Sequence, residues 1–438
     1  MDNQNTRLPF VPNYLFCIPY LPILLLTAFL TANCSGANAD YGYAEVKVCR
    51  DTTSALARTL GQFADNMGNS LNGTMIIAMH DTILVERAYG FKQLYKEPTG
   101  YGNLSWNRLA ELKSEPSNKM TMATLFDLAS VSKQFTAAAV LKLCADGKLR
   151  LTDSLGKYYP GFPYPKVTVK QLLTHTSGIP EYFNFPFNIY DTTVFVTNRQ
   201  LVKALMRQRY PVMFARGSRF KYVNTNYAIL ADLVSHVTGK TFESYVREQL
   251  WKPAGMKDAM FFTELVDPDA ELKRKHVSIA GNKEYVTVSP KEGYDELHLA
   301  RGHWRSGALA QYDRLNGILG DKGIYASAED LVKWTSAFYI KKEIIPAEWV
   351  EEAIKCQNRL INGTLPAEWY GYGVRMEEKD QHGLTVYHGG LWDGFHNVWL
   401  YRPSDGLTIV FLSNYYNRAH IGKCNEVLDL VDSVKHNR

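Results

Sequence analysis

The chain has 438 residues, of which 46% are hydrophobic and 21% are charged, and its formal net charge is +5 at neutral pH. This length and apolar content allow a large buried core and exclude a disordered or fibrous protein. The positive charges do not form a long basic run, so no nucleic-acid partner is expected.

Residues 1–39 are expected to form a signal peptide. An apolar stretch covers 15–30, and Ala37-Asn38-Ala39 has the small-x-small pattern that signal peptidase accepts, so the mature chain would begin near Asp40. Two alternatives stay open, a lipoprotein cut before Cys34 and an uncleaved anchor. We therefore expect export to the periplasm or beyond the cell, with membrane contact only through this segment if it is uncleaved or lipidated.

The rest of the chain, 40–438, is expected to be one domain, because no repeat or linker divides it. The hydrophobic pattern predicts helices and strands in this order: a helix at 50–67, a hairpin of strands at 74–79 and 82–88, helices at 130–145, 199–209, 226–238, 241–250 and 328–340, strands at 384–388, 395–401 and 407–413, and a last helix near 422–436. Strands at both ends predict an α+β fold (α/β sandwich). Its antiparallel sheet would be built from both termini, flanked by helices, and interrupted by an inserted, mostly helical region.

Four cysteines would remain after removal of the leader: Cys49, Cys144, Cys356 and Cys424. Their spacing fits neither a C-x-x-C pair nor a metal site, so no metal is expected. Cys144 is interpreted as a packing residue. A disulfide between Cys49 and Cys424 stays open.

The expected helix at 130–145 begins with Ser130 and carries Lys133 one turn later in an otherwise apolar run. Residues three apart share a helix face, with roughly 5–6 Å between their Cβ atoms, so the Lys133 amine can reach the Ser130 hydroxyl. Burial and the helix dipole disfavour the ammonium form. The pair therefore predicts a serine nucleophile with a lysine base.

The S-x-x-K spacing also occurs at Ser154 and Ser218, but neither opens a long apolar helix. There is no G-x-S-x-G elbow, no Walker loop and no H-E-x-x-H pair, which leaves cofactor-free acyl transfer as the predicted chemistry. A purely structural role for Lys133 is disfavoured because a buried amine is costly without a function.

Six sequence blocks follow one another in an order found in a known superfamily. They read LFDLASVSK at 125–133, GKLRLTD at 147–153, LLTHTSGIP at 172–180, FKYVNTNY at 220–227, GDKGIYAS at 320–327 and HGGLWDG at 388–394. The chain thereby resembles the serine β-lactamase and penicillin-binding protein superfamily over roughly residues 50–435. It is most similar to the class C β-lactamase-like branch of esterases, D-aminopeptidases and D-alanyl-D-alanine carboxypeptidases.

The resemblance implies roles for further residues. Its Y-x-N element falls on Tyr222, which would relay protons with Lys133, and on Asn224, which would hold the Lys133 amine or a substrate amide. Its third element, usually Lys-Thr/Ser-Gly, appears as His388-Gly389-Gly390. There the Leu391 amide would join that of Ser130 in an oxyanion hole.

The change from lysine to His388 removes a permanent cation, because imidazole has a reference pKa of about 6.5. Neutral esters or amides are therefore expected to compete well with carboxylate-bearing substrates. Other aromatic and histidine residues have structural interpretations: His175 as a hydrogen-bonded structural residue, and Trp392, Phe395 and Trp399 as core or site wall.

We expect an exported serine hydrolase that acts through an acyl-enzyme on an ester, an amide, a D-amino-acid peptide or a β-lactam. Its partner would be a small-molecule or peptide substrate, and it would need no cofactor. The alternative is a binding module of the same fold, such as a penicillin sensor that acylates and stalls, or an inactive relative. Substrate choice is expected to depend on the loops at 91–121, 184–198 and 264–319, which lie between the blocks.

Overall fold

The computed structural model describes residues 48–67, 71–94, 115–190, 195–265, 285–286, 298–305, 307–310, 312–358, 369–379, 381–416 and 419–436. The expected leader at 1–39 lies outside these residues, as do parts of the three loops assigned to substrate choice. Within the described part of the chain, no helix is both long enough and apolar enough to span a bilayer.

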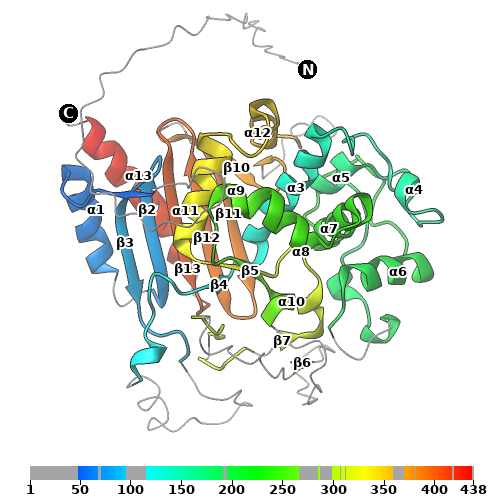
Figure 1. The fold of residues 1–438 in the computed structure, drawn as a ribbon, viewed down its shortest axis with the longest axis horizontal. Helices are drawn as coiled ribbons and strands as arrows, with labels where there is room; N and C mark the ends of the chain where they lie inside the picture. The colour runs from blue at the N-terminus through cyan, green and yellow to red at the C-terminus, as the bar shows by residue number, and fades with distance from the viewer. Residues whose placement is uncertain are drawn as a thin grey trace, which may run out of the picture.

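The main sheet has eight strands in the order β1-β3-β2-β13-β12-β11-β10-β9 (Figure 1). Its strands are β1 (Cys49–Arg50), β2 (Gly73–Met79), β3 (Thr82–Tyr89), β9 (Trp369–Tyr370), β10 (Arg375–Lys379), β11 (Gly383–Trp392), β12 (Phe395–Arg402) and β13 (Leu407–Ser413). All neighbouring strands are antiparallel except β1 and β3. β2 pairs with β13 from Gly73↔Ser413 to Met79↔Leu407. A strand from the first part of the described chain therefore lies beside one from its last part, near the centre of the sheet. This is the arrangement predicted from the sequence.

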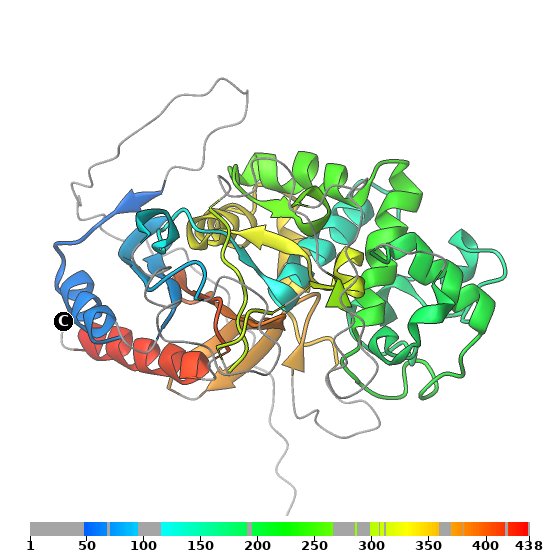
Figure 2. The same ribbon diagram turned by 90° about the horizontal axis from the view of Figure 1, so that it is seen from below.

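Helices cover both faces of the sheet. One face carries α1 (Ala55–Asn66) and α13 (Ala419–His436), which lie side by side in Figure 2 and pack on an apolar cluster that includes Leu60, Ile409 and Val427. The other face carries α11 (Ala328–Trp334), which contacts β2 and β13, and joins the larger core. The central strands β2, β12 and β13 therefore have two buried faces, which explains the nearly continuous apolar runs in β12 and β13.

The remaining helices form the region inserted between the strands, and most of them, α3 to α8 and α10, lie on the right of the molecule in Figure 1. The α-helices outside the layers above are α3 (Lys133–Ala145), α4 (Leu155–Tyr158), α5 (Val169–Leu173), α6 (Asn198–Gln208), α7 (Asn224–Thr238), α8 (Phe242–Val246), α9 (Lys252–Ala254), α10 (Phe262–Leu265) and α12 (Ala347–Ala353). Short 3-10 and π segments are η1 (Pro116–Asn118), η2 (Ala129–Ser132), η3 (Tyr182–Asn184), η4 (Phe187–Ile189), η5 (Arg247–Trp251), η7 (Arg314–Gly317) and η8 (Thr335–Ile340). Two small sheets combine β4 (Phe126–Asp127), β8 (Ile324–Ala326) and β5 (Met260–Phe261), and β6 (Tyr285–Val286) with β7 (Tyr312–Asp313).

Helix boundaries follow local chemistry. α1 begins after Ser54, whose hydroxyl accepts a hydrogen bond from the Ala57 amide, and α6 begins after Thr197, which forms a capping box with Gln200. α7 ends at Gly239, whose φ of 69° favours glycine. The expected helix at 130–145 differs from the prediction, because its first turn is the 3-10 segment η2 and the α-helix starts at Lys133.

No disulfide joins any two of the four described cysteines, Cys49, Cys144, Cys356 and Cys424. The Cys49–Cys424 disulfide that the sequence left open is therefore not formed.

Candidate active site

Ser130 lies in a strained turn between β4 and α3. Ala129 just before it has a φ of 49°, a left-handed conformation that is uncommon for a residue with a side chain. The Asp127 carboxylate accepts a hydrogen bond from the Ala129 amide at 2.8 Å, and the Asn397 amide donates to the Asp127 carbonyl at 2.7 Å. These bonds fix the turn, so Ser130 is held at the start of α3 while its side chain stays partly exposed.

Lys133 is completely buried and its amine lies against three oxygens. Nζ is 3.0 Å from Ser130 Oγ, 2.8 Å from Asn224 Oδ1 and 2.8 Å from the Asp321 carbonyl. The amide and carbonyl oxygens can only accept, so a neutral amine gives its two protons to them and points its lone pair at the Ser130 hydroxyl. This is the geometry that a general base for Ser130 requires.

Burial lowers the pKa of Lys133 to about 8, and the Arg375 cation acts in the same direction. The negative charges of Asp321 and Glu181 oppose this shift. A substantial fraction of Lys133 is therefore unprotonated at mildly alkaline pH, unlike a solvent-exposed lysine.

Tyr222 lies next to the Lys133 amine, which is 4.9 Å from the centre of its ring. Its hydroxyl is buried and faces Ser130 without a hydrogen bond of normal geometry. Burial raises the pKa of Tyr222 above its ordinary value, whereas Ser130 and Arg375 lower it. Tyr222 is thus a neutral phenol near pH 7. It can relay a proton by accepting one as it donates its own, but it is not a tyrosinate base.

Asn224 is the first residue of α7, and it is held at both ends of its amide. Oδ1 accepts from Lys133, while Nδ2 and the backbone amide both donate to Glu181 Oε2, at 3.0 and 2.8 Å. The structure therefore places Ser130, Lys133 and Asn224 in one hydrogen-bonded chain and adds Glu181 to it.

The strand β11 forms the other side of the site. β10 pairs with β11 only as far as Tyr387, so on that side the edge from His388 to Trp392 has no strand partner among the described residues. Gly390 lies against η2 so closely that a Cβ there would be 2.2 Å from the Leu128 carbonyl oxygen. The following residue, Leu391, is 52% exposed.

His388 is 1% exposed and neutral. Its Nδ1 is 2.7 Å from the Gly389 carbonyl and its Nε2 is 3.3 Å from the Tyr370 hydroxyl, so Nδ1 carries the proton and Nε2 accepts. Burial lowers the pKa of His388 well below its usual range, and the cations Arg375 and Lys133 add to this effect.

Arg375 brings a permanent cation to the site that the sequence analysis did not identify. Its guanidinium is 4.9 Å from the centre of the Tyr222 ring and 6.0 Å from that of Tyr370. Its charge also lowers the pKa of His175. The expectation that replacement of a lysine by His388 leaves this region without a fixed cation is therefore wrong.

His175 is a structural residue, as the sequence suggested. Its Nδ1 accepts a hydrogen bond from the Val223 amide at 3.1 Å, and its ring packs 4.4 Å from that of Tyr222. It therefore supports both the backbone and the ring of the Y-x-N segment. Trp399 and Phe395 are core residues, and Trp392 stacks on Phe183 at 5.1 Å.

The other two S-x-x-K matches do not form such a site. Lys157, three residues after Ser154, exposes 55% of its side chain and pairs with Asp153. Lys221, three residues after Ser218, is exposed. Burial of the lysine therefore distinguishes Ser130 from both.

Three residues of the site were missed by sequence reasoning. Asp321 contributes a backbone carbonyl from a block that the sequence analysis quoted, and Glu181 directly follows another such block, so block position was the available signal for both. Arg375 lies in the short strand β10, outside every block, and no sequence pattern marked it.

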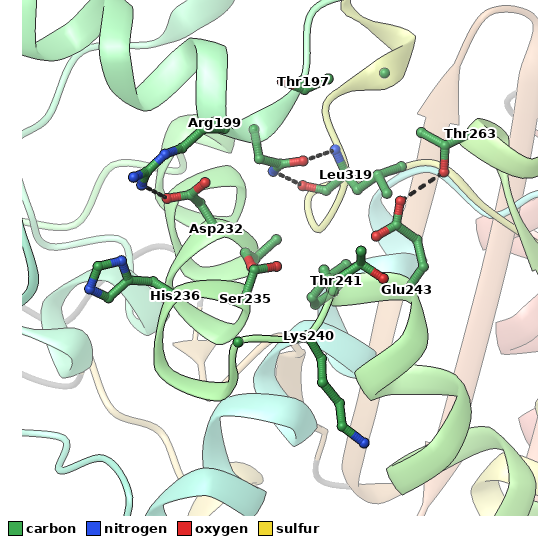
Figure 3. A pocket seen from close by; sticks show the side chains of 15 residues that line it. Thr197, Arg199, Asp232, Ser235, His236, Lys240, Thr241, Glu243, Thr263 and Leu319 are labelled. Atoms are coloured by element: carbon green, nitrogen blue, oxygen red, sulfur yellow. Dashed lines mark hydrogen bonds and ion pairs between the residues drawn. The ribbon is translucent and has the colours of Figure 1, made fainter. Parts of the chain in front are cut away.

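A separate hollow of about 450 Å³ lies between α6, α7 and α8 (Figure 3). On its wall, Asp232 accepts hydrogen bonds from Arg199 at 3.4 Å and from Tyr159 at 2.8 Å. None of the predicted catalytic or substrate-binding residues lines this hollow.

Comparison with known proteins gives consistent results. The chain matches the family described as Beta-lactamase over residues 55–428. It is 27% identical to Penicillin-binding protein 4* of Bacillus subtilis (strain 168) over 368 residues, which is 83% of this chain and 72% of that protein. It is 25% identical to Protein flp of Staphylococcus aureus (strain MW2) over 382 residues, 85% of this chain but only 64% of that longer protein. A crystal structure of D-amino acid amidase from Ochrobactrum anthropi SV3 shows the same fold, with a TM-score of 0.61, 18% identity, and coverage of 88% of this chain and 100% of the amidase.

Proposed function

The chain belongs to the beta-lactamase family and is a serine hydrolase, and from this premise we propose that it cleaves carbonyl substrates through an acyl-enzyme on Ser130. The observation that carries the proposal is the buried Lys133 amine, held by two oxygens that can only accept and lying 3.0 Å from Ser130 Oγ. The substrate classes are those with an acyl carbonyl and a leaving amine or alcohol: D-amino-acid peptides or amides, esters and β-lactams.

In the proposed reaction, Ser130 Oγ forms a bond to the substrate carbonyl carbon while its proton passes to Lys133 Nζ. The bond to the leaving group then breaks, and the leaving group takes a proton through Tyr222 and Lys133. Water attacks the acyl-Ser130 ester with the same pair as base, and the acid product leaves with Ser130 restored. The amides of Ser130 and Leu391 would stabilise the negative oxygen of both tetrahedral intermediates.

The test is covalent labelling with a fluorescent penicillin and a fluorophosphonate in parallel, followed by mass spectrometry of the modified peptide. We expect the adduct on Ser130, and we expect Ser130→Ala to abolish both labelling and turnover with an unchanged melting temperature, since only one partly exposed oxygen is lost. Ser154→Ala and Ser218→Ala are the matched controls and should keep both. An adduct on Ser154 or Ser218, or no labelling by either probe, would contradict the proposal.

The same experiment separates hydrolysis from binding. A penicillin sensor would be labelled once on Ser130 and would release no product, whereas the proposed hydrolase shows burst kinetics followed by steady turnover. Stoichiometric labelling without turnover would favour the sensor.

The charge of the preferred substrate is proposed to depend on Arg375. His388 is neutral, so the guanidinium beside Tyr222 is the group that would attract a substrate carboxylate. Loss of a hydrogen bond to a charged group costs about 1.5–3 kcal/mol. We therefore expect Arg375→Gln to lower the ratio of kcat/KM for nitrocefin over p-nitrophenyl butyrate by about one to two orders of magnitude.

The control for this prediction is Arg247→Gln, because the Arg247 guanidinium also lies over an aromatic ring, that of Trp251, at 5.3 Å. It should leave the ratio unchanged. If Arg375→Gln also leaves it unchanged, the site does not use this cation for carboxylate recognition, and the expectation of neutral substrates based on His388 is favoured.

We also propose that the protein is exported to the periplasm or beyond the cell. The support is the sequence alone: the apolar stretch at 15–30 and the small-x-small pattern at 37–39.

A further inference from the structure

Glu181 is a buried carboxylate beside the catalytic lysine that the proposed reaction does not use. It comes directly after Pro180 and immediately before η3, and burial raises its pKa. The hydrogen bonds from the Asn224 backbone and side chain act in the opposite direction by favouring the ionised form. A charge in this position is costly unless it is compensated, so its partners indicate what it does.

Both of the short hydrogen bonds to Glu181 come from Asn224. One carboxylate oxygen accepts from the Asn224 backbone amide at 2.8 Å and from its side-chain Nδ2 at 3.0 Å. A carboxylate cannot donate, so it can bind only the NH2 end of the asparagine amide. The oxygen end of that amide must then point the other way, and it does so, accepting from Lys133 Nζ at 2.8 Å.

Glu181 also acts on Lys133 through its charge. The amine lies near two carboxylates, Asp321 and Glu181, and both favour its protonated form, whereas burial and Arg375 favour the neutral form. Asp321 is tied to the Tyr182 hydroxyl at 2.8 Å and lies 3.8 Å from the Lys322 amine. Glu181 has no cation so close among the described hydrogen bonds and ion pairs, so a change of its charge is less compensated locally.

We infer that Glu181 is a positioning residue for acyl transfer: its carboxylate fixes the Asn224 amide with the oxygen toward Lys133, and its charge raises the pH at which the Lys133 amine becomes a base. The inference rests on the proposed function, because it assigns a role within that reaction. It makes two separable predictions, one for geometry and one for charge.

The experiment compares Glu181→Gln, Glu181→Ala and the wild type by their rates of fluorophosphonate labelling and of ester hydrolysis from pH 5.5 to 10. Glutamine can still accept from Asn224 but carries no charge. The rates of Glu181→Gln should therefore rise with pH at a midpoint about one unit lower than in the wild type, a shift typical of losing a nearby opposite charge. The Glu181→Ala substitution also frees the Asn224 amide to turn. The maximal rate of this variant at high pH should therefore be roughly 10–100-fold lower than that of the wild type, as expected for a displaced catalytic group.

The matched control is Asp232→Asn, which also removes a buried carboxylate, in this case one that α7 itself carries. Asp232 lies eight residues after Asn224, about 12 Å along the helix, on the wall of the hollow in Figure 3. The dependence of the labelling rate on pH should be the same in Asp232→Asn as in the wild type. Melting temperatures of all variants check folding, and if Glu181→Ala does not fold, Glu181→Gln alone decides the question.

The inference would be overturned if the rate of Glu181→Gln rose with pH at the same midpoint as that of the wild type. It would also be overturned if the maximal rate of Glu181→Ala equalled that of the wild type. In both cases labelling of Ser130 would continue. Absence of labelling in the wild type would instead overturn the proposed function, so the two failures are distinguishable.

Discussion

At the scale of single residues, environment rather than residue type decides what a buried lysine does. Lys133 and Lys322 are both buried, and each amine meets three oxygens. Lys322 donates to the Tyr182 hydroxyl and to two backbone carbonyls, and it has a carboxylate counterion 3.8 Å away. The Tyr182 hydroxyl is buried and already donates its proton to Asp321 at 2.8 Å. One of the three contacts of Lys133 is instead the hydroxyl of the partly exposed Ser130, which a substrate can reach. Only Lys133 can therefore act as a base for a nucleophile.

The protonation state of Lys133 should control how kcat/KM depends on pH. With burial lowering its pKa to about 8, the amine is protonated and inactive below that pH and becomes a base above it, so kcat/KM should rise with pH to a plateau with a midpoint near 8. Lys133→Arg should be inactive at every pH tested, as should Lys133→Ala, because guanidinium stays protonated.

The control for this series is Lys142→Arg, in the same helix α3, where the amine pairs with Asp146 at the surface. It should keep the wild-type profile. A flat profile between pH 6 and 10, or activity in Lys133→Arg, would mean that another group takes the proton from Ser130.

The side-chain contacts expected from the sequence are present where a motif brings residues together locally. Ser130 and Lys133 are one helical turn apart, so their contact follows from spacing, and Asn224 was found by its place among the blocks. Glu181 and Arg375 act across long sequence separations, from a loop and from the short strand β10 between β9 and β11. No local pattern encodes such an approach, because it depends on how the helical region packs against the sheet.

At the scale of elements, the site is a junction between the turn that holds Ser130 and the part of β11, residues 388–392, that does not pair with β10. The sequence predicted the hairpin β2–β3 and the strands β11–β13 because their apolar runs are long. It missed β9 and β10, which are short and separated by Gly371 and Gly373. Because β10 was not predicted, the sequence could not show that its pairing with β11 stops at Tyr387.

Gly390→Ala should damage this junction. The added Cβ would be 2.2 Å from the Leu128 carbonyl oxygen, which is backbone and cannot rotate away, so β11 and η2 must separate. We expect a loss of about 1–3 kcal/mol in the free energy of unfolding and a fall in kcat of roughly 100-fold, because a displacement of about 1 Å is enough to misalign a catalytic group.

The adjacent Gly389→Ala is the matched control, because the nearest atom to its Cβ would be the Asn397 oxygen at an ordinary 3.8 Å. Urea unfolding and ester hydrolysis of both variants check the prediction. Equal effects of the two substitutions would show that the close contact at Gly390 does not position the site.

At the scale of the whole molecule, the order of elements along the chain was sufficient to predict the layout. Strands near both ends with helices between them gave a sheet built from both termini with an inserted helical region, and the structure has this arrangement. The sequence could not show which helices share a face of the sheet. An amphipathic pattern shows that one side of α1 or α13 is buried, but not that the two helices pack on each other.

The pairing of β2 with β13 also has a consequence for protein synthesis. At a translation rate of about 5–20 residues per second, β13 leaves the ribosome roughly tens of seconds after β2. Until then the nascent hairpin β2–β3 presents an open edge to other chains, a known aggregation hazard. The β11 wall beside Ser130 is likewise missing, so a growing chain can contain every residue of the S-x-x-K and Y-x-N elements and still have no complete active site.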